Sequence, residues 1–194
     1  VLIEKVRTRM HDYADMILAL FFYAGMGFAV IFTSLNHSGS FNLSSFLFGS
    51  LMTISQADLY IVAALGIFII IFILALYRPL QYLAYDEVSA KVAGLPADTL
   101  NLWLSVLTAL TVALSMRVVG ILLVSAMMVI PVACALQWSR SFSGTMLRGV
   151  GFALFSVTLG MFLSYELNLA PGGTIVLVGA GCFLFSMLYT INKK

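Results

Sequence analysis

The stretch "LNLWLSVLTALTVALSMRVVGILLVSAMMVIPVACALQ", residues 100–137, decides the fold. Its thirty-eight residues carry one charged side chain, Arg117. As a single helix it would be about 57 Å long at 1.5 Å per residue, nearly twice the ~30 Å hydrocarbon core of a bilayer. Two membrane-spanning helices joined by a tight turn fit better. We expect the turn at "SMRVVG", residues 115–120, where Arg117 reaches the lipid head groups and Gly120 loosens the backbone.

The rest of the chain has the same apolar character. In the whole sequence of 194 residues, 62% are hydrophobic and 9% are charged, against about a quarter charged in a typical soluble domain. The composition predicts an all-α fold, a polytopic transmembrane helical bundle forming one domain over residues 1–194. About six spans are expected, at approximately residues 13–35, 58–77, 99–116, 119–137, 149–165 and 174–191.

The basic residues indicate the orientation of these spans. If the six spans alternate in direction, nine of the ten Lys and Arg residues fall on one side and only Arg117 on the other. The positive-inside rule then places both ends of the chain in the cytoplasm. The net charge of +2 is small and dispersed, which argues against a nucleic-acid partner.

Motifs of known enzyme chemistry are missing from the sequence. It contains no G-x-x-x-x-G-K-[ST], H-E-x-x-H, G-x-S-x-G or C-x-x-C. Cys134 and Cys182 lie in apolar runs and are expected to be packing residues rather than a disulfide or a metal site. We therefore expect a protein that is not an enzyme.

One short segment, "YDEVSAKVAGLP" (residues 85–96), looks like a water-soluble helix between two spans. Asp86 can cap its N-terminus, Glu87 can pair with Lys91 one turn on, and Gly94 can end it. The topology places this helix on the cytoplasmic side.

Four segments, in this order and spacing, carry a resemblance to a known family. They are "FLFGSLMTISQADL", "YDEVSAKVAGLP", "SMRVVGILLVSAMMVIPVACA" and "LNLAPGGTIVL". Together they resemble the permease subunits of metal-ion ABC importers, which take up zinc, manganese or iron(II), and most of all the zinc-uptake permeases. The resemblance covers nearly the whole chain, and "RVVGILLVSAMMVIPVACA" is its most specific part.

The resemblance implies a permease homodimer in the bacterial plasma (inner) membrane, forming a translocation channel. A separate cytoplasmic ATP-binding subunit would hydrolyse ATP, and an extracytoplasmic metal-binding protein would deliver the ion. The chain itself would bind no cofactor, and its transported divalent metal would be zinc rather than manganese or iron. Family members usually have about two more spans upstream, so we expect a C-terminal fragment of a permease. An ion-coupled secondary transporter or a channel is the alternative.

Few side chains on the outer side could contact a metal ion. Carboxylate and imidazole ligands suit divalent cations, and the candidates are Asp58, His37 and Glu166. Asp58 also has a simpler role as a negative charge at a helix N-terminus. The connection over residues 36–57 mixes apolar and polar residues and favours an interfacial or re-entrant helix.

Two cytoplasmic segments are candidates for coupling to the ATPase. The first is the short helix, where Val88 and Val92 share a face that would pack on the bundle or on a partner. The second is the loop over residues 137–149, which analogy with the vitamin B12 and siderophore importers favours as the main coupler. The candidate residues are Asp86, Glu87, Lys91 and Gly94 in the helix, and Gln137, Arg140, Gly144 and Arg148 in the loop.

Overall fold

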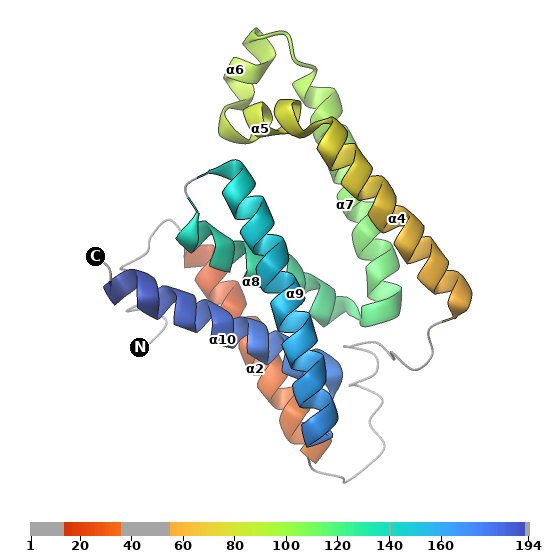
Figure 1. Ribbon diagram of the computed structural model, residues 1–194, viewed down its shortest axis with the longest axis vertical. Coiled ribbons are helices and arrows are strands. Elements are labelled where there is room, and N and C mark those ends of the chain that lie inside the picture. The colour runs from red at the N-terminus through yellow and green to blue at the C-terminus, as the bar shows by residue number, and fades with distance from the viewer. Residues whose placement is uncertain (1–13, 36–54, 140, 193–194) are drawn as a thin grey trace. The chain divides into compact units, whose positions relative to one another are not determined.

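The computed structural model describes residues 14–35, 55–139 and 141–192, and these parts are all-helical (Figure 1). The all-α fold predicted from the sequence is confirmed. The expected interfacial or re-entrant helix of the outer connection lies largely outside the described residues. The helices of the described parts are α2 (Ala14–Leu35), α4 (Gln56–Ala75), α5 (Tyr77–Tyr85), α6 (Glu87–Val92), α7 (Ala97–Val119), α8 (Ile121–Trp138), α9 (Phe142–Leu167) and α10 (Pro171–Asn192).

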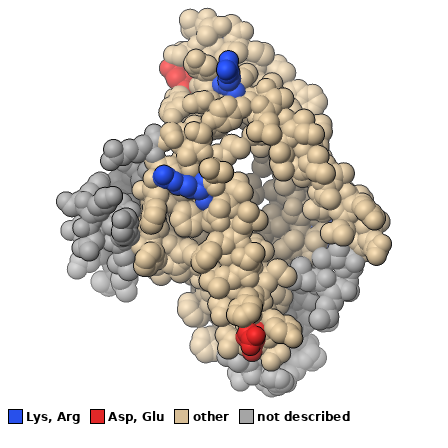
Figure 2. Space-filling model, viewed as in Figure 1, with Lys and Arg blue, Asp and Glu red and all other residues tan. Residues whose placement is uncertain are grey.

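Four of these helices, α4, α7, α8 and α9, are long and apolar enough to cross a membrane. Helices α2 and α10 contain shorter apolar segments, Leu18–Phe32 and Pro171–Met187. Each of the six overlaps one of the spans expected from the sequence. The face drawn in Figure 2 shows few charged side chains on an otherwise uncharged surface, as a bilayer requires.

The long apolar stretch of residues 100–137 divides into two helices at the turn expected from its length. Helix α7 ends at Val119 and α8 begins at Ile121, and Gly120 between them has a φ of 87°. Such a positive φ suits glycine because it has no Cβ. The expected tight turn is therefore confirmed. Pro131 lies within α8 and is buried, and the helix continues through it.

The chain divides into two compact units, described separately below. In the unit that contains α2, α8, α9 and α10, α10 packs against each of the other three helices. Its core is formed by α2, α8 and α10, with Ile130 and Cys134 of α8 almost completely buried. Helices α8, α9 and α10 of this bundle also line a groove.

Helix α9 packs through small residues, against α8 at Gly149 and against α10 at Gly160. Its buried positions are Gly149, Ser156, Gly160 and Ser164, which recur at intervals of one or two turns. A Cβ placed on Gly160 would lie 2.6 Å from the Cα of Ile175. Such close backbone approach through small side chains is typical of helix packing in membranes, where van der Waals contact drives association.

In the other unit, α4 and α7 run antiparallel. Phe72 and Trp103 bring their ring centroids to 6.4 Å, and Asp58 faces Arg117 at the other end of the pair. The two contacts are fourteen residues apart on each helix, about 21 Å. The two helices therefore keep one register along their length.

Helix α5 was not expected from the sequence. The predicted span ran to residue 77, but α4 ends at Ala75 and α5 continues from Tyr77 to Tyr85. Pro79 lies in the first turn of α5, where a missing N–H costs no helical hydrogen bond. Helix α5 leads directly into α6, so two short helices connect α4 to α7.

The loop expected over residues 137–149 is mostly helical, and this expectation was wrong. Helix α8 extends to Trp138, and α9 begins at Phe142. Ser141 caps α9 by accepting a hydrogen bond from the amide of Gly144 at 3.2 Å. A run of Ser, Gly and Thr resembles a loop in composition, but a capping serine lets it form the first turns of a helix.

Candidate functional site

Asp58, the first candidate metal ligand, lies in the first turn of α4 and already has two partners. Its Oδ2 accepts a hydrogen bond from the amide of Ser55 at 3.4 Å, as part of a capping box. Its Oδ1 lies 3.8 Å from Nη2 of Arg117. The Asp58 side chain is 20% exposed and that of Arg117 is 77% exposed. A cation at Asp58 would have to compete with this guanidinium.

Of the other two outer candidates, only Glu166 lies within the described residues. Glu166 is exposed near the end of α9, in the other compact unit. His37 lies outside the described residues. Among the described residues no three His, Cys, Asp or Glu side chains gather into a group that could hold a metal ion.

Helix α6 has the cap that the sequence predicts. Oδ1 of Asp86 accepts hydrogen bonds from the amides of Val88 at 2.9 Å and Ser89 at 3.2 Å. The Ser89 hydroxyl also donates to Oδ2 of Asp86. This hydroxyl, followed by the Ser89 and Val88 amides, lowers the pKa of the Asp86 carboxyl below its usual value of 3.8. The Asp86 carboxylate therefore acts as the N-cap of α6.

The C-terminal end of α6 is equally well satisfied. Gly94, with a φ of 80°, donates to the carbonyl of Lys91, and Leu95 donates to that of Ala90, both at 3.1 Å. These two bonds make a Schellman motif, in which a left-handed glycine ends the helix. The predicted stop at Gly94 is confirmed.

The charge pair on α6 includes a third member that sequence reasoning missed. Lys91 lies 3.1 Å from Glu87, as predicted, and also 2.7 Å from Asp98 in the first turn of α7. Hydrogen bonds to Asp98 first and Glu87 second raise the pKa of the Lys91 ammonium above its usual 10.5. The signal for this contact was available, because the turn ending at Pro96 brings the start of the next helix back beside Lys91.

The two valines of α6 are exposed, whereas Ala90 of the same helix is buried. Val88 is 71% exposed and Val92 is 85% exposed. Neither valine is buried by the other helices of its own unit. The valine pair is left accessible to another molecule.

The candidates around the α8–α9 connection lie mostly within helices. Gln137 faces the bundle, since its Oε1 accepts a hydrogen bond from the Ser186 hydroxyl of α10 at 3.1 Å. Arg148 of α9 donates through Nη1 to the carbonyl of Trp138 and to the Ser139 hydroxyl, the latter at 3.2 Å. Gly144 is in the first turn of α9, and Arg140 lies outside the described residues.

The long helices of the described parts are apolar, and the bundle packs closely through small residues. These features define a polytopic helical membrane protein. The comparison with known sequences is more specific. The ABC 3 transport family matches residues 1–190, and the chain belongs to this family.

Named relatives support the assignment. The chain is 38% identical over 180 residues to a "Probable metal transport system membrane protein" of Treponema pallidum, covering 92% of this chain and 66% of the relative. It is 29% identical over 194 residues to the "Manganese import system permease protein ScaB" of Streptococcus parasanguinis, covering 100% of this chain and 69% of the relative.

A solved structure shows the same fold. It is described as "PsaBC from Streptococcus pneumoniae in complex with Fab", with a TM-score of 0.71 at 28% identity, covering 96% of this chain and 66% of that one. The chain therefore spans about two thirds of the length of several of its relatives.

Proposed function

We propose that the chain is part of the membrane-spanning permease of an ATP-driven importer of divalent metal ions. The observation that carries this proposal is the family match over residues 1–190, on a chain whose long helices are apolar enough for a bilayer. The sequence itself contains no nucleotide-binding loop, so the ATPase would be a separate cytoplasmic subunit.

Manganese is the metal that the relatives favour. Three Streptococcus relatives and one from Halalkalibacterium halodurans are named for manganese transport or import, and others for metal transport in general. The zinc preference expected from the sequence has no support in these names. We propose manganese(II) as the first ion to test, with zinc and iron(II) as competitors.

The proposed ion path begins at the outer side, with Asp58, His37 and Glu166 as weak contacts. An extracytoplasmic metal-binding protein would deliver the ion there. Because Asp58 already faces Arg117 at 3.8 Å, a passing cation would be held weakly. Weak binding suits a transfer path, since an ion must leave each contact as readily as it arrives.

On the cytoplasmic side we propose α6 as one docking element for the ATPase. Its charges are satisfied by Asp86 with Ser89 and by Lys91 with Glu87 and Asp98. The side chains that it presents outward are Val88 and Val92. Exposed apolar groups beside satisfied polar ones are typical of the centre of a protein interface.

The assembly we propose is a permease homodimer in the bacterial plasma membrane, with both ends of this chain in the cytoplasm. The distribution of Lys and Arg supports that orientation. Labelling of cysteines introduced beside Lys5 and Lys194 with a membrane-impermeant reagent tests it. Labelling from the outside of intact cells would reverse the assignment.

Transport is tested in proteoliposomes that contain the complete permease, its cognate ATPase and its binding protein. We expect manganese uptake that requires ATP, with competition by zinc and iron(II) ranking the ions. Uptake that persists without ATP and collapses with the proton or sodium gradient would instead establish an ion-coupled secondary transporter.

Docking is tested by replacing Val88 and Val92 with Gln and measuring the affinity for the ATPase. The matched control is Thr99→Gln, an exposed change of similar kind outside α6. We expect the double variant to lose affinity and ATP-driven uptake together, while the control keeps both. Unchanged affinity of the double variant would remove α6 from the interface without affecting the proposal of metal transport.

A further inference from the structure

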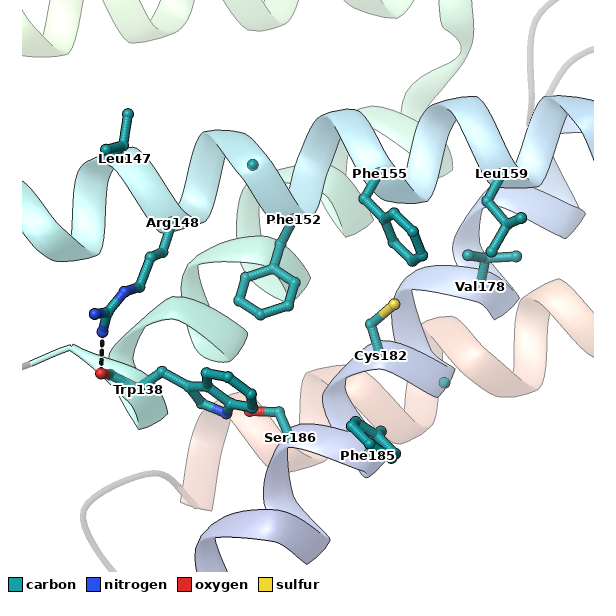
Figure 3. A pocket seen from close by; sticks show the side chains of 12 residues that line it. Trp138, Leu147, Arg148, Phe152, Phe155, Leu159, Val178, Cys182, Phe185 and Ser186 are labelled. Carbon is teal, nitrogen blue, oxygen red and sulfur yellow. Dashed lines mark hydrogen bonds between the residues drawn. The ribbon is translucent and has the colours of Figure 1, made fainter.

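A groove of about 970 Å³ runs between α9 and α10, near the end of α8 (Figure 3). Phe152, Phe155 and Leu159 line it from α9, and Val178 and Phe185 line it from α10. Its volume is at the upper end of the range for pockets that hold small organic molecules. The bundle therefore has an apolar space that its own side chains do not fill.

Two glycines contribute to this groove without being required for helix packing. Gly151 of α9 and Gly181 of α10 both line it, and a Cβ on either would meet no atom within 4 Å. By contrast, a Cβ on Gly160 would collide with the backbone of Ile175. Glycine inside a helix costs about 0.5–1 kcal/mol relative to alanine. The missing side chains at Gly151 and Gly181 leave room in the groove for an occupant.

The groove has one polar end. Arg148 and Trp138 lie there together, and Leu159 and Val178 lie at the opposite end (Figure 3). Arg148 uses Nη1 for both of its hydrogen bonds, to the Trp138 carbonyl and the Ser139 hydroxyl. Since a guanidinium carries five N–H donors, others remain for a phosphate. The residues that line the groove include no Asp or Glu.

The dimensions and position of the groove match one leaflet of a bilayer. Leu147 and Leu159 of α9 lie at the two ends of the groove (Figure 3). They are twelve residues apart, about 18 Å along the helix. Half of a ~30 Å hydrocarbon core is about 15 Å. Tryptophan favours the membrane interface, and the distribution of Lys and Arg assigns the Arg148 end to the cytoplasmic side.

We propose that this groove binds an anionic phospholipid of the cytoplasmic leaflet, with its acyl chains along Phe152 and Phe155 and its head-group phosphate at Arg148. Basic sites between transmembrane helices on the cytoplasmic side are suited to anionic head groups. Charge complementarity at Arg148 favours this occupant over a helix from a second copy of the chain, which would leave the remaining donors beside apolar side chains. The proposal does not depend on the transported metal.

Trp138 provides a direct probe of the groove. The chain contains two tryptophans, so Trp103→Phe leaves Trp138 as its reporter. The full chain is placed in phosphatidylcholine nanodiscs with a minor share of brominated phosphatidylglycerol or, in the matched arm, the same share of brominated phosphatidylcholine. Bromine on an acyl chain quenches tryptophan fluorescence on contact. We expect phosphatidylglycerol to bind in the groove about fivefold more tightly, the factor for one basic residue near an anionic lipid surface, and to quench Trp138 more strongly at equal lipid share.

Variants of Arg148 separate charge from fold. Arg148→Gln should abolish the preference for phosphatidylglycerol, and Arg148→Lys should keep most of it. The matched control is Arg78→Gln, since Arg78 is exposed but does not line the groove. Equal quenching by the two lipids in the parent chain, or a preference that survives Arg148→Gln, would overturn the proposal.

Variants of the open glycines test the space itself. Gly181→Leu should lower quenching by both lipids, because its side chain fills the groove. Gly66→Leu on α4 should not, although Gly66 also has open space around it. Finally, Gly181→Cys, with Cys134 and Cys182 replaced by alanine, should not cross-link two copies. Efficient cross-linking at that position would show a second copy in the groove and overturn the proposal.

Discussion

The contact between Gly160 and Ile175 gives the sharpest test of how the bundle is packed. A Cβ added to Gly160 would lie 2.6 Å from Cα, 2.7 Å from Cγ1 and 3.0 Å from N of Ile175. Two of these three atoms belong to the backbone, so side-chain rotation alone cannot relieve the overlap. Helices α9 and α10 would have to separate. We expect Gly160→Ala to destabilise the bundle by about 1–3 kcal/mol, the usual cost of overpacking.

The control for this variant lies on the same helix. At Gly151 a Cβ meets nothing within 4 Å, so Gly151→Ala gains helix propensity without a clash. Alanine is favoured over glycine in a helix by about 0.5–1 kcal/mol. Unfolding by sodium dodecyl sulfate, followed by circular dichroism, should therefore move the two midpoints in opposite directions. If Gly160→Ala and Gly151→Ala had the same effect, close backbone approach would not explain Gly160.

A double variant tests the source of the strain. Ile175→Ala removes Cγ1 but leaves Cα and N in place, so it should relieve less than half of the Gly160→Ala penalty in a double-mutant cycle. Full relief would place the clash in the side chain and contradict the backbone argument.

Three further results are expected. Asp58→Asn and Arg117→Gln should each lower stability in dodecyl sulfate unfolding by no more than about 1 kcal/mol, because the Arg117 side chain is 77% exposed and lies 3.8 Å from the carboxylate; metal uptake lost with Asp58→Asn but kept with Arg117→Gln would mark the carboxylate as a metal contact. Since the pKa of Asp86 is lowered, its cap should be fully effective above pH 3.8 and weaken as the pH falls below that value. Amides in the first turn of α6 should lose hydrogen-exchange protection there, and protection that stays constant would refute the assignment. Ser186→Ala should cost about 0.6 kcal/mol and no more than about 1.7, the average and the maximum for hydrogen bonds between membrane helices, as its bond to Gln137 is lost; an unchanged midpoint would show that this bond contributes nothing.

The break between α7 and α8 was predictable because it follows from length. No single helix of residues 100–137 fits a bilayer, and Gly120 is a residue that accepts a positive φ. The ends of α6 were predictable for a similar reason. Asp86 and Gly94 act within one turn of their own positions, so local sequence contains the whole interaction.

Contacts between residues far apart in the sequence could not be predicted in the same way. The bond from Arg148 to the Trp138 carbonyl depends on how sharply α8 turns into α9. The partnership of Asp58 with Arg117 requires the register of α4 against α7. Neither follows from periodicity, because both are set by packing between helices.

The distribution of satisfied and exposed groups on α6 has a consequence for any partner. Lys91 is held by Glu87 and Asp98, so its positive charge is already compensated before another protein arrives. Val88 and Val92 remain exposed, and burying them against a partner removes apolar surface from water, which favours association. Screening by salt weakens interactions between exposed charges and leaves apolar burial intact. An interface centred on the valines should therefore keep its affinity at high ionic strength, whereas an interface built on Lys91 should not.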